Sequence, residues 1–342
     1  MPPSALTGVP LAPLTTLRLG GPAAKVVEAR SDDELVEAVR ACDEAGQQVL
    51  VLAGGSNVVI ADEGFDGTVV RVLTRGVQRD GAVLDVAAGE PWDAVVAAAV
   101  AEDLAGIECL SGIPGSTGAT PIQNVGAYGQ DVAQTITSVR VYDRETATVE
   151  ELAASELGFA YRTSALRYHD RRVVLRVRFE LAESERSGAL TYTELARTVG
   201  AERAPLRDVR EAVLGLRRGK GMVVDPSDPD SVSAGSFFTN PILEPAEFAQ
   251  LEQRAGEAPP RFAEPDGRVK TSAAWLIERA GFHKGDVRGN VGISTKHSLA
   301  LINRGGATTA ELVAFAREIA SAVRERFGVD LHPEPIFVGH SL

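Results

Sequence analysis

A glycine-rich segment without a hydrophobic period is the feature of this 342-residue sequence that most restricts its fold. It runs from Ser111 to Gly129 and reads SGIPGSTGATPIQNVGAYG. Regular patterns flank it, since a helical pattern starts at Pro91 and strand patterns resume at Ser138–Tyr142. A long loop without secondary structure inside a compact domain is usually functional or disordered. Because glycine permits positive φ and close backbone approach, we expect this segment to wrap around a ligand.

Residues 1–20 are expected to form an irregular arm, and a second glycine-rich turn follows the β-α-β pattern that comes after it. Ser31 and Glu34 predict a capping box at the start of its helix, as Thr308 and Glu311 do for a long helix near the C-terminus, and Val49–Leu52 predicts the following strand. The chain then enters a turn made of Gly54, Gly55, Ser56 and Asn57. Exposed N–H groups in such a turn suit phosphate oxygens. The turn matches neither G-x-G-x-x-G nor the P-loop pattern, so a Rossmann or NTPase assignment is not supported. Two such loops in one half of the chain favour a dinucleotide ligand.

Composition restricts the partners and the compartment. The formal net charge is -12, which disfavours binding to nucleic acid and to acidic membrane surfaces. Cys42 and Cys109 lack the spacing of a disulfide framework or metal site, and we expect two buried free thiols. The histidines show no ligand spacing, so no metal is expected. Because neither a secretory signal nor a membrane-spanning apolar stretch is recognisable, we expect a cytoplasmic protein.

Four motifs carry a resemblance to a known family. They are the segment from Ile113 to Gly129 that follows the Gly-Gly turn, FAYRTS at 159–164, AGSFFTNP at 234–241 and HPEPIFVG at 332–339. In order and spacing they resemble the first subtype of the UDP-N-acetylenolpyruvoylglucosamine reductase family. Strands alternating with helices agree with mixed α and β layers.

The resemblance implies an α+β fold with non-covalent FAD. It predicts a two-subdomain FAD-binding fold of the vanillyl-alcohol oxidase type and a smaller α+β substrate-binding domain. The expected parts are subdomain 1 at 1–75, with the C-terminal strand 330–342 returning to it, subdomain 2 at 76–220, and the UDP-sugar domain at 221–329. Besides Gly54, Gly55, Ser56 and Asn57, the expected FAD contacts are Ile113, Gly115, Ser116, Gly118, Ala119, Gln123, Asn124, Gly126 and Ala127.

Three catalytic residues are implied by the same resemblance. Arg162 presents a planar fork that matches a carboxylate, and it would stabilise the charge that builds on an enolpyruvyl group. Ser236, beside two phenylalanines, would protonate the substrate carbon. Glu334 would polarise the enol or help to deliver the proton. The sequence departs from the family at Ala53, at His332 and at Pro335, and a proline removes a ladder N–H, which puts the local strand pairing in question.

Further ligand contacts are expected at single positions. The substrate-binding residues implied are Tyr128, Tyr192, Lys220, Asn240 and His297. Arg217 and Arg218 form a basic cluster with Lys220, but we interpret the two arginines as a solvated helix end whose charge favours the helix dipole.

The implied activity is that of a UDP-N-acetylmuramate dehydrogenase in peptidoglycan precursor synthesis, and so in cell-wall formation and cell division. NADPH would give hydride to flavin N5, and the flavin would reduce the enolpyruvyl ether of UDP-N-acetylglucosamine. The partners would be these small molecules alone, and the protein a monomer. A flavin oxidase of the same fold acting on another sugar or alcohol is the alternative. A non-catalytic nucleotide- or flavin-binding module is a third reading, which the presence of Arg162, Ser236 and Glu334 disfavours.

Overall fold

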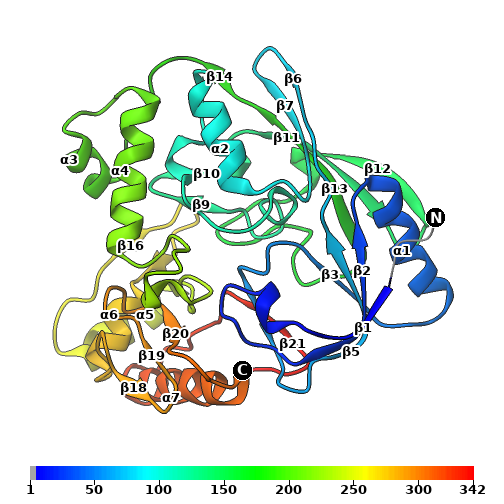
Figure 1. Cartoon of the computed structure of the whole chain (residues 1–342). Coiled ribbons are helices and arrows are strands. Elements are labelled where there is room, and N and C mark those ends of the chain that lie inside the picture. The colour runs from blue at the N-terminus through cyan, green and yellow to red at the C-terminus, as the bar shows by residue number, and fades with distance from the viewer. Residues whose placement is uncertain (1–4) are drawn as a thin grey trace. The chain divides into compact units, whose positions relative to one another are not determined.

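The computed structural model describes residues 5–342 as two compact units (Figure 1). Unit 1 comprises the described residues up to Val9 together with Ala23–Gly55 and Phe65–Gly219. Unit 2 comprises Pro10–Pro22, Ser56–Gly64 and Lys220–Leu342. The chain therefore passes between the units several times before it enters unit 2 for its last third.

Unit 1 contains two main sheets and four helices. Its helices are α1 Asp32–Glu44, α2 Trp92–Ala101, α3 Thr193–Val199 and α4 Leu206–Gly219. Its strands are β1 Ala5–Pro10, β2 Pro22–Ala29, β3 Val49–Leu52, β5 Phe65–Val72, β6 Val77–Asp80, β7 Val83–Ala87, β8 Leu104–Ala105, β9 Gly126–Ala127, β10 Gln130–Asp131, β11 Ile136–Asp143, β12 Thr148–Ala153, β13 Arg172–Glu180 and β14 Ala182–Glu183. One sheet has the order β1-β2-β5-β3, with β5 parallel to both β2 and β3. The other is antiparallel in the order β12-β11-β13-β7-β6.

The core of unit 1 follows from helical spacing of apolar residues. In α1 the residues Leu35, Val39 and Cys42 are buried, and Figure 1 shows this helix beside the strands of the first sheet. In α2 the ring of Trp92 packs on that of Phe179 in β13, with 5.5 Å between the centroids. Burying such side chains contributes about 1.5–3 kcal/mol each. These contacts fix the start of α2, beside which the glycine-rich segment lies.

Unit 2 is built from three helices and short strands. Its helices are α5 Pro245–Ala255, α6 Ala273–Arg279 and α7 Thr309–Phe327. Its strands are β4 Val58–Ile60, β15 Ile242–Leu243, β16 Phe262–Ala263, β17 Val269–Lys270, β18 Val287–Arg288, β19 Val291–Ile293, β20 Leu301–Asn303 and β21 Ile336–Val338. They pair in the orders β15-β17-β16, β18-β19-β20 and β21-β4, the last pair being parallel. The C-terminal strand thus returns to a strand that directly follows the Gly-Gly turn.

The capping predictions show where local sequence is sufficient. At α7 the Thr308 hydroxyl accepts from the Glu311 N–H at 3.1 Å, and Glu311 accepts from the Thr308 N–H at 2.8 Å. At α1 only half of the predicted box forms, because Ser31 accepts from the Glu34 N–H while the Glu34 carboxylate accepts from the Arg30 N–H. The prediction of an irregular arm over residues 1–20 is wrong for 5–10, which form β1, and its first four residues lie outside the described part.

Candidate active site

The two glycine-rich segments meet backbone to backbone in unit 1. A side-chain carbon added at Gly54 would lie 2.6 Å from the Cα of Gly115 and 3.0 Å from its carbonyl carbon. Real Cβ atoms do not approach so closely, so only glycine fits there. Gly55 and Gly115 have φ values of 58° and 111°, which L-residues rarely adopt. Chain segments about sixty residues apart therefore form one continuous backbone surface.

The second segment is held by the beginning of α2. The Gly115 carbonyl accepts from the Trp92 N–H at 3.0 Å, and the N–H groups of Thr117 and Gly118 donate to Glu90 and Ala88, each at 2.8 Å. Ser116, Gly118 and Ala119 thus belong to a fixed turn. The N–H groups of Gly54, Gly55 and Gly115 find no acceptor among residues 5–342. Donors that are left over in a glycine-lined cradle suit phosphate oxygens, so these residues fit the pyrophosphate of FAD.

Asn124 anchors the far end of the glycine-rich segment. Its backbone is left-handed with φ 47°, its side-chain oxygen accepts from the Ala133 N–H, and its amide donates to the Ala160 carbonyl, both at 3.1 Å. Gly126 and Ala127 then form β9, which pairs with β10. Ile113 and Gln123 are half-buried, and Ile113 packs against the core of unit 1.

Arg162 stands in a tight turn tied to this segment. The backbone groups of Ala160 and Thr163 bond to each other in both directions, at 3.1 and 3.2 Å, which places Arg162 third in a four-residue turn. Its φ is 55°, and its carbonyl accepts a hydrogen bond from the guanidinium of the buried Arg167. Ser164 donates to the Ile122 carbonyl at 2.8 Å. These bonds fix the turn against the glycine-rich segment.

The Arg162 guanidinium lies beside the predicted cofactor loop. A carbon added at Gly126 would lie 3.3 Å from its Nη1 atom. Burial raises the pKa of the Asp131 carboxyl, and the Arg162 charge acts against that rise. The structure therefore brings the predicted carboxylate-binding arginine to the end of the predicted FAD loop, within one unit.

The burial of Arg217 was not expected from the sequence. This residue lies in the last turn of α4 and is half-buried, whereas Arg218 is exposed. Burial lowers its pKa to about 10. The charges of Tyr128 and Asp93 oppose this fall, and that of Arg162 adds to it. The interpretation as a solvated helix end is wrong for Arg217, because burial is the main cause of its lowered pKa. Its position seven residues after Arg210, on the same helix face, is the signal that could have found it.

Two predicted substrate tyrosines also meet. The rings of Tyr128 and Tyr192 pack edge to face, with 5.3 Å between their centroids. Tyr128 has φ 51°, and Tyr192 precedes α3 with 43% of its surface exposed. An exposed aromatic ring packed on a half-buried neighbour can cover a bound ligand.

Ser236 and Glu334 come together in unit 2. The Glu334 N–H donates to the Phe237 carbonyl at 2.9 Å, and Phe238 pairs with Pro333 in an antiparallel bridge. Both phenylalanines are 1% exposed, while Ser236 and Glu334 are half-buried. The two phenylalanines next to Ser236 are therefore dry, while Ser236 itself keeps part of its surface exposed. The two segments lie about a hundred residues apart in the sequence.

Asn57 braces the strand that carries Glu334. Its side-chain amide donates to the Glu334 carbonyl at 3.3 Å, and its own carbonyl accepts from the Ile336 N–H at 2.9 Å. Pro335 lies between these two bonds and is buried. The missing proline N–H therefore costs no ladder bond, because the N–H groups on both sides of it have acceptors.

The remaining predicted ligand residues show local contacts. The Asn240 side-chain oxygen accepts from the Ala273 N–H at the start of α6, at 3.0 Å. His297 Nδ1 accepts from the Leu299 N–H at 3.1 Å, so Nδ1 carries no proton in this arrangement. Lys220 is half-buried and directly follows α4. Arg162 belongs to unit 1, and Ser236 and Glu334 belong to unit 2, so their convergence on one ligand stays a prediction.

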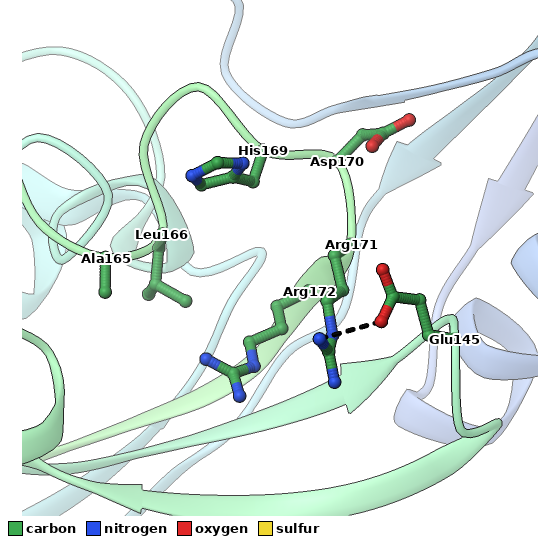
Figure 2. Close-up of a pocket in the computed structure, with 7 residues that line it drawn as sticks. All are labelled: Glu145, Ala165, Leu166, His169, Asp170, Arg171 and Arg172. Carbon is green, nitrogen blue, oxygen red and sulfur yellow. Dashed lines mark ion pairs between the residues drawn. The ribbon is translucent and has the colours of Figure 1, made fainter.

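A separate pocket lies near the start of β13 (Figure 2). It has a volume of about 400 Å³, and Figure 2 shows the Arg171 side chain directed toward Glu145, with which it forms an ion pair at 2.7 Å. Its lining residues are Glu145, Ala165, Leu166, His169, Asp170, Arg171 and Arg172. None of the predicted site residues lines it.

Residues 5–342 contain neither a candidate metal site nor a helix suited to crossing a membrane. No group of three or more histidine, cysteine, aspartate or glutamate side chains has an arrangement that could hold a metal ion. None of the described helices combines the length and apolar character that a membrane crossing requires. Cys42 and Cys109 are both free and buried, as expected.

Known protein families and relatives match nearly the whole chain. Residues 23–153 match a family model described as an FAD binding domain. Residues 226–338 match the C-terminal domain of UDP-N-acetylenolpyruvoylglucosamine reductase. The chain is 56% identical to the enzyme of that name from Thermobifida fusca, over 98% of each chain. It is 54% identical to that from Streptomyces coelicolor, over 100% of this chain and 92% of the relative.

A solved structure also matches this chain over nearly its whole length. The crystal structure of UDP-N-acetylenolpyruvylglucosamine reductase from Thermus caldophilus covers 98% of both chains, with 25% identity and a TM-score of 0.68. The expected FAD-binding fold with mixed α and β elements is confirmed. By these matches, and by the motifs that predicted them, the chain belongs to the UDP-N-acetylenolpyruvoylglucosamine reductase family.

Proposed function

We propose that this protein reduces the enolpyruvyl ether of UDP-N-acetylglucosamine to UDP-N-acetylmuramate, with FAD as cofactor and NADPH as hydride donor. The relatives that it matches over nearly its full length carry the name of this reductase. The observation that carries the proposal is a backbone cradle lined by glycines with an arginine beside it. Gly54 lies against Gly115, and the Arg162 guanidinium lies beside Gly126. The product serves the synthesis of peptidoglycan precursors.

The cradle residues would hold the cofactor. Backbone N–H groups of Gly54, Gly55 and Gly115 would donate to the pyrophosphate, and the segment from Ser116 to Ala127 would lie along the remainder. Because added carbons collide at Gly54 and at Gly118, side chains there would disrupt the fixed turn. When bound, FAD accepts a hydride from NADPH and supplies it to the enolpyruvyl methylene carbon.

Three polar side chains would then bind the substrate carboxylate, donate the proton and orient the enol. Arg162 would bind the enolpyruvyl carboxylate through its fork and stabilise the negative charge that builds next to it. Ser236 would donate its hydroxyl proton to the neighbouring carbon, and bulk solvent would restore that proton. Glu334, held by Phe237 and Asn57, would orient the reacting enol.

Ligand contacts and domain roles belong to the same proposal. Tyr128, Tyr192, Lys220, Asn240 and His297 would contact the sugar nucleotide. We propose residues 1–75 with 330–342 as the first FAD-binding subdomain, 76–220 as the second and 221–329 as the UDP-sugar domain. The division between units at Gly219 supports the boundary near residue 220, and the pairing of β21 with β4 supports the return of the C-terminal strand to the first 75 residues, although both strands lie in unit 2. We further propose a cytoplasmic monomer that does not bind nucleic acid.

An anaerobic spectral experiment tests the proposal. Purified protein loaded with FAD is titrated with NADPH, which should bleach the flavin absorbance. Adding the enolpyruvyl UDP-sugar should restore the absorbance and yield UDP-N-acetylmuramate in a one-to-one ratio to the NADPH consumed. No response to the enolpyruvyl sugar, together with rapid recovery in oxygen, would instead support a flavin oxidase acting on another alcohol or sugar.

A further inference from the structure

The Asp93 carboxylate joins three parts of unit 1. Its Oδ1 accepts from the Gly112 N–H at 2.6 Å and from Arg210 Nη1 at 2.7 Å. Its Oδ2 accepts from Arg210 Nη2 at 2.9 Å. One side chain thus connects α2, the start of the glycine-rich segment and α4. Gly112 stands 19 residues and Arg210 stands 117 residues from Asp93 in the sequence.

This geometry is that of a strong ion pair. A guanidinium that donates two parallel bonds to one carboxylate fixes direction as well as distance. The Arg210 side chain is only 17% exposed, against 40% for Asp93, so little of this pair's arginine is left to water. Burial by itself would raise the pKa of Asp93, but the bonds from Arg210 and Gly112 lower it. Asp93 is therefore ionised at neutral pH.

The arginine of this pair lies on the helix that carries Arg217. Arg210 and Arg217 are seven residues apart in α4, which puts them on one face of the helix. The charge of Asp93 favours the charged form of Arg217, whereas the charge of Arg162 disfavours it. Arg217 and Arg162 repel each other, and Asp93, which is fixed by Gly112 and Arg210, is one of the charges that oppose this repulsion.

We propose that Asp93 and Arg210 are positioning residues for the anionic part of the substrate. They hold the glycine-rich segment and α4 in the register that presents Arg217 beside Arg162 and Tyr128. This inference rests on the proposed function, since it takes that site as the place where the sugar nucleotide binds. Neither Asp93 nor Arg210 contacts the substrate in this account.

A second ion pair in unit 1 provides a matched control. Arg144 donates to both carboxylate oxygens of Asp43, with a shortest distance of 2.6 Å, across 101 residues of sequence. The side chains are 15% and 25% exposed, similar to the Asp93–Arg210 pair. It joins α1 to the turn after β11 and contacts none of the predicted site residues. Asp43→Asn should therefore cost stability without changing substrate affinity.

The experiment compares Asp93→Asn, Arg210→Lys and Asp43→Asn in the FAD-loaded enzyme. Calorimetry measures the Kd of the enolpyruvyl UDP-sugar for the oxidised enzyme, where no turnover occurs, and steady-state assays give KM and kcat. Asp93→Asn should raise Kd and KM about tenfold, the worth of a hydrogen-bonded charge, with kcat reduced less than about threefold. Arg210→Lys keeps the charge and loses the fork, so it should give a smaller rise. Asp43→Asn should lower the melting temperature like Asp93→Asn and leave Kd unchanged.

The outcomes separate the two claims. Equal effects of Asp93→Asn and Asp43→Asn on Kd would overturn the positioning role, because both pairs would then act through stability alone. If Asp93→Asn does not fold, the Arg210→Lys variant decides the matter in the same way. A wild-type enzyme that binds the sugar without reducing it would refute the proposed function, while the comparison of Kd values still judges the positioning role. A wild-type enzyme that binds no enolpyruvyl UDP-sugar would overturn both.

Discussion

The backbone of Arg162 predicts that Arg162→Gly is more stable than Arg162→Ala, although both variants lose activity. Its φ of 55° is enforced by the turn between Ala160 and Thr163 and by the bond from Arg167 to its carbonyl. A left-handed conformation costs an L-residue about 1–2 kcal/mol. Glycine avoids that cost but loses about 0.5–1 kcal/mol more chain entropy than alanine on folding. The difference leaves Arg162→Gly more stable than Arg162→Ala by roughly 0.5–1 kcal/mol.

Both variants lose the guanidinium, so they serve as controls for each other. Each should reduce kcat by about 100-fold or more, the usual effect of removing one stabilising donor at a site of developing charge. Urea unfolding of the FAD-loaded protein measures the stability difference, and NADPH oxidation with the enolpyruvyl sugar measures kcat.

Two results would refute this reasoning. If alanine were as stable as glycine at position 162, the left-handed backbone would not be present in solution. If the glycine variant kept near-normal turnover, the side chain would not be the catalytic group. Arg162→Lys, which keeps the charge without the fork, should also turn over poorly.

Three other outcomes are expected. Ser236→Ala should keep flavin reduction by NADPH within about threefold in stopped-flow traces, yet slow reoxidation by the enolpyruvyl sugar by about 100-fold or more; equal losses in both would remove the proton-donor role. The lowered pKa of Asp93 means that its ionised form stabilises the fold at pH values above its ordinary pKa of 3.8, and that this contribution is lost as pH falls through the lower folded value. Denaturant midpoints of wild type and Asp93→Asn should therefore differ at neutral pH and converge in acid. Burial raises the pKa of Cys109 to about 12, so iodoacetamide should leave this thiol unmodified in the native protein and label it after unfolding, as followed by mass spectrometry.

Local patterns in the sequence predicted the elements well. The strand expected at Val49–Leu52 has those bounds, and the Thr308–Glu311 capping box forms with both bonds. Such features depend on neighbours within a few residues, so composition and period determine them. The glycine-rich segment from Ser111 to Gly129 was expected to lack long elements, and it contains only a 3₁₀ turn and the two-residue β9.

Features that depend on distant partners were not predictable. The pKa of Arg217 depends on its burial and on the charges of Tyr128 and Asp93, which lie far from it in the sequence. The consequence of Pro335 was left open by the sequence, since the bonds from Glu334 to Phe237 and from Ile336 to Asn57 are formed only in the fold.

Motif spacing predicted the family, but the roles of single side chains stay predictions. Ser236 and Glu334 are neighbours in unit 2, and Arg162 lies beside Gly126 in unit 1. Each half of the proposed site is therefore formed within its own unit. The claim that remains to be tested is that the two halves act on one substrate.

A crystal structure of the FAD-loaded enzyme with the enolpyruvyl UDP-sugar tests that claim most directly. The account predicts that the Arg162 guanidinium, the Ser236 hydroxyl and the Glu334 carboxylate all lie within about 3.2 Å of the enolpyruvyl group, directly or through one water. An enolpyruvyl group bound at the cofactor with Ser236 or Glu334 directed away from it would contradict the account.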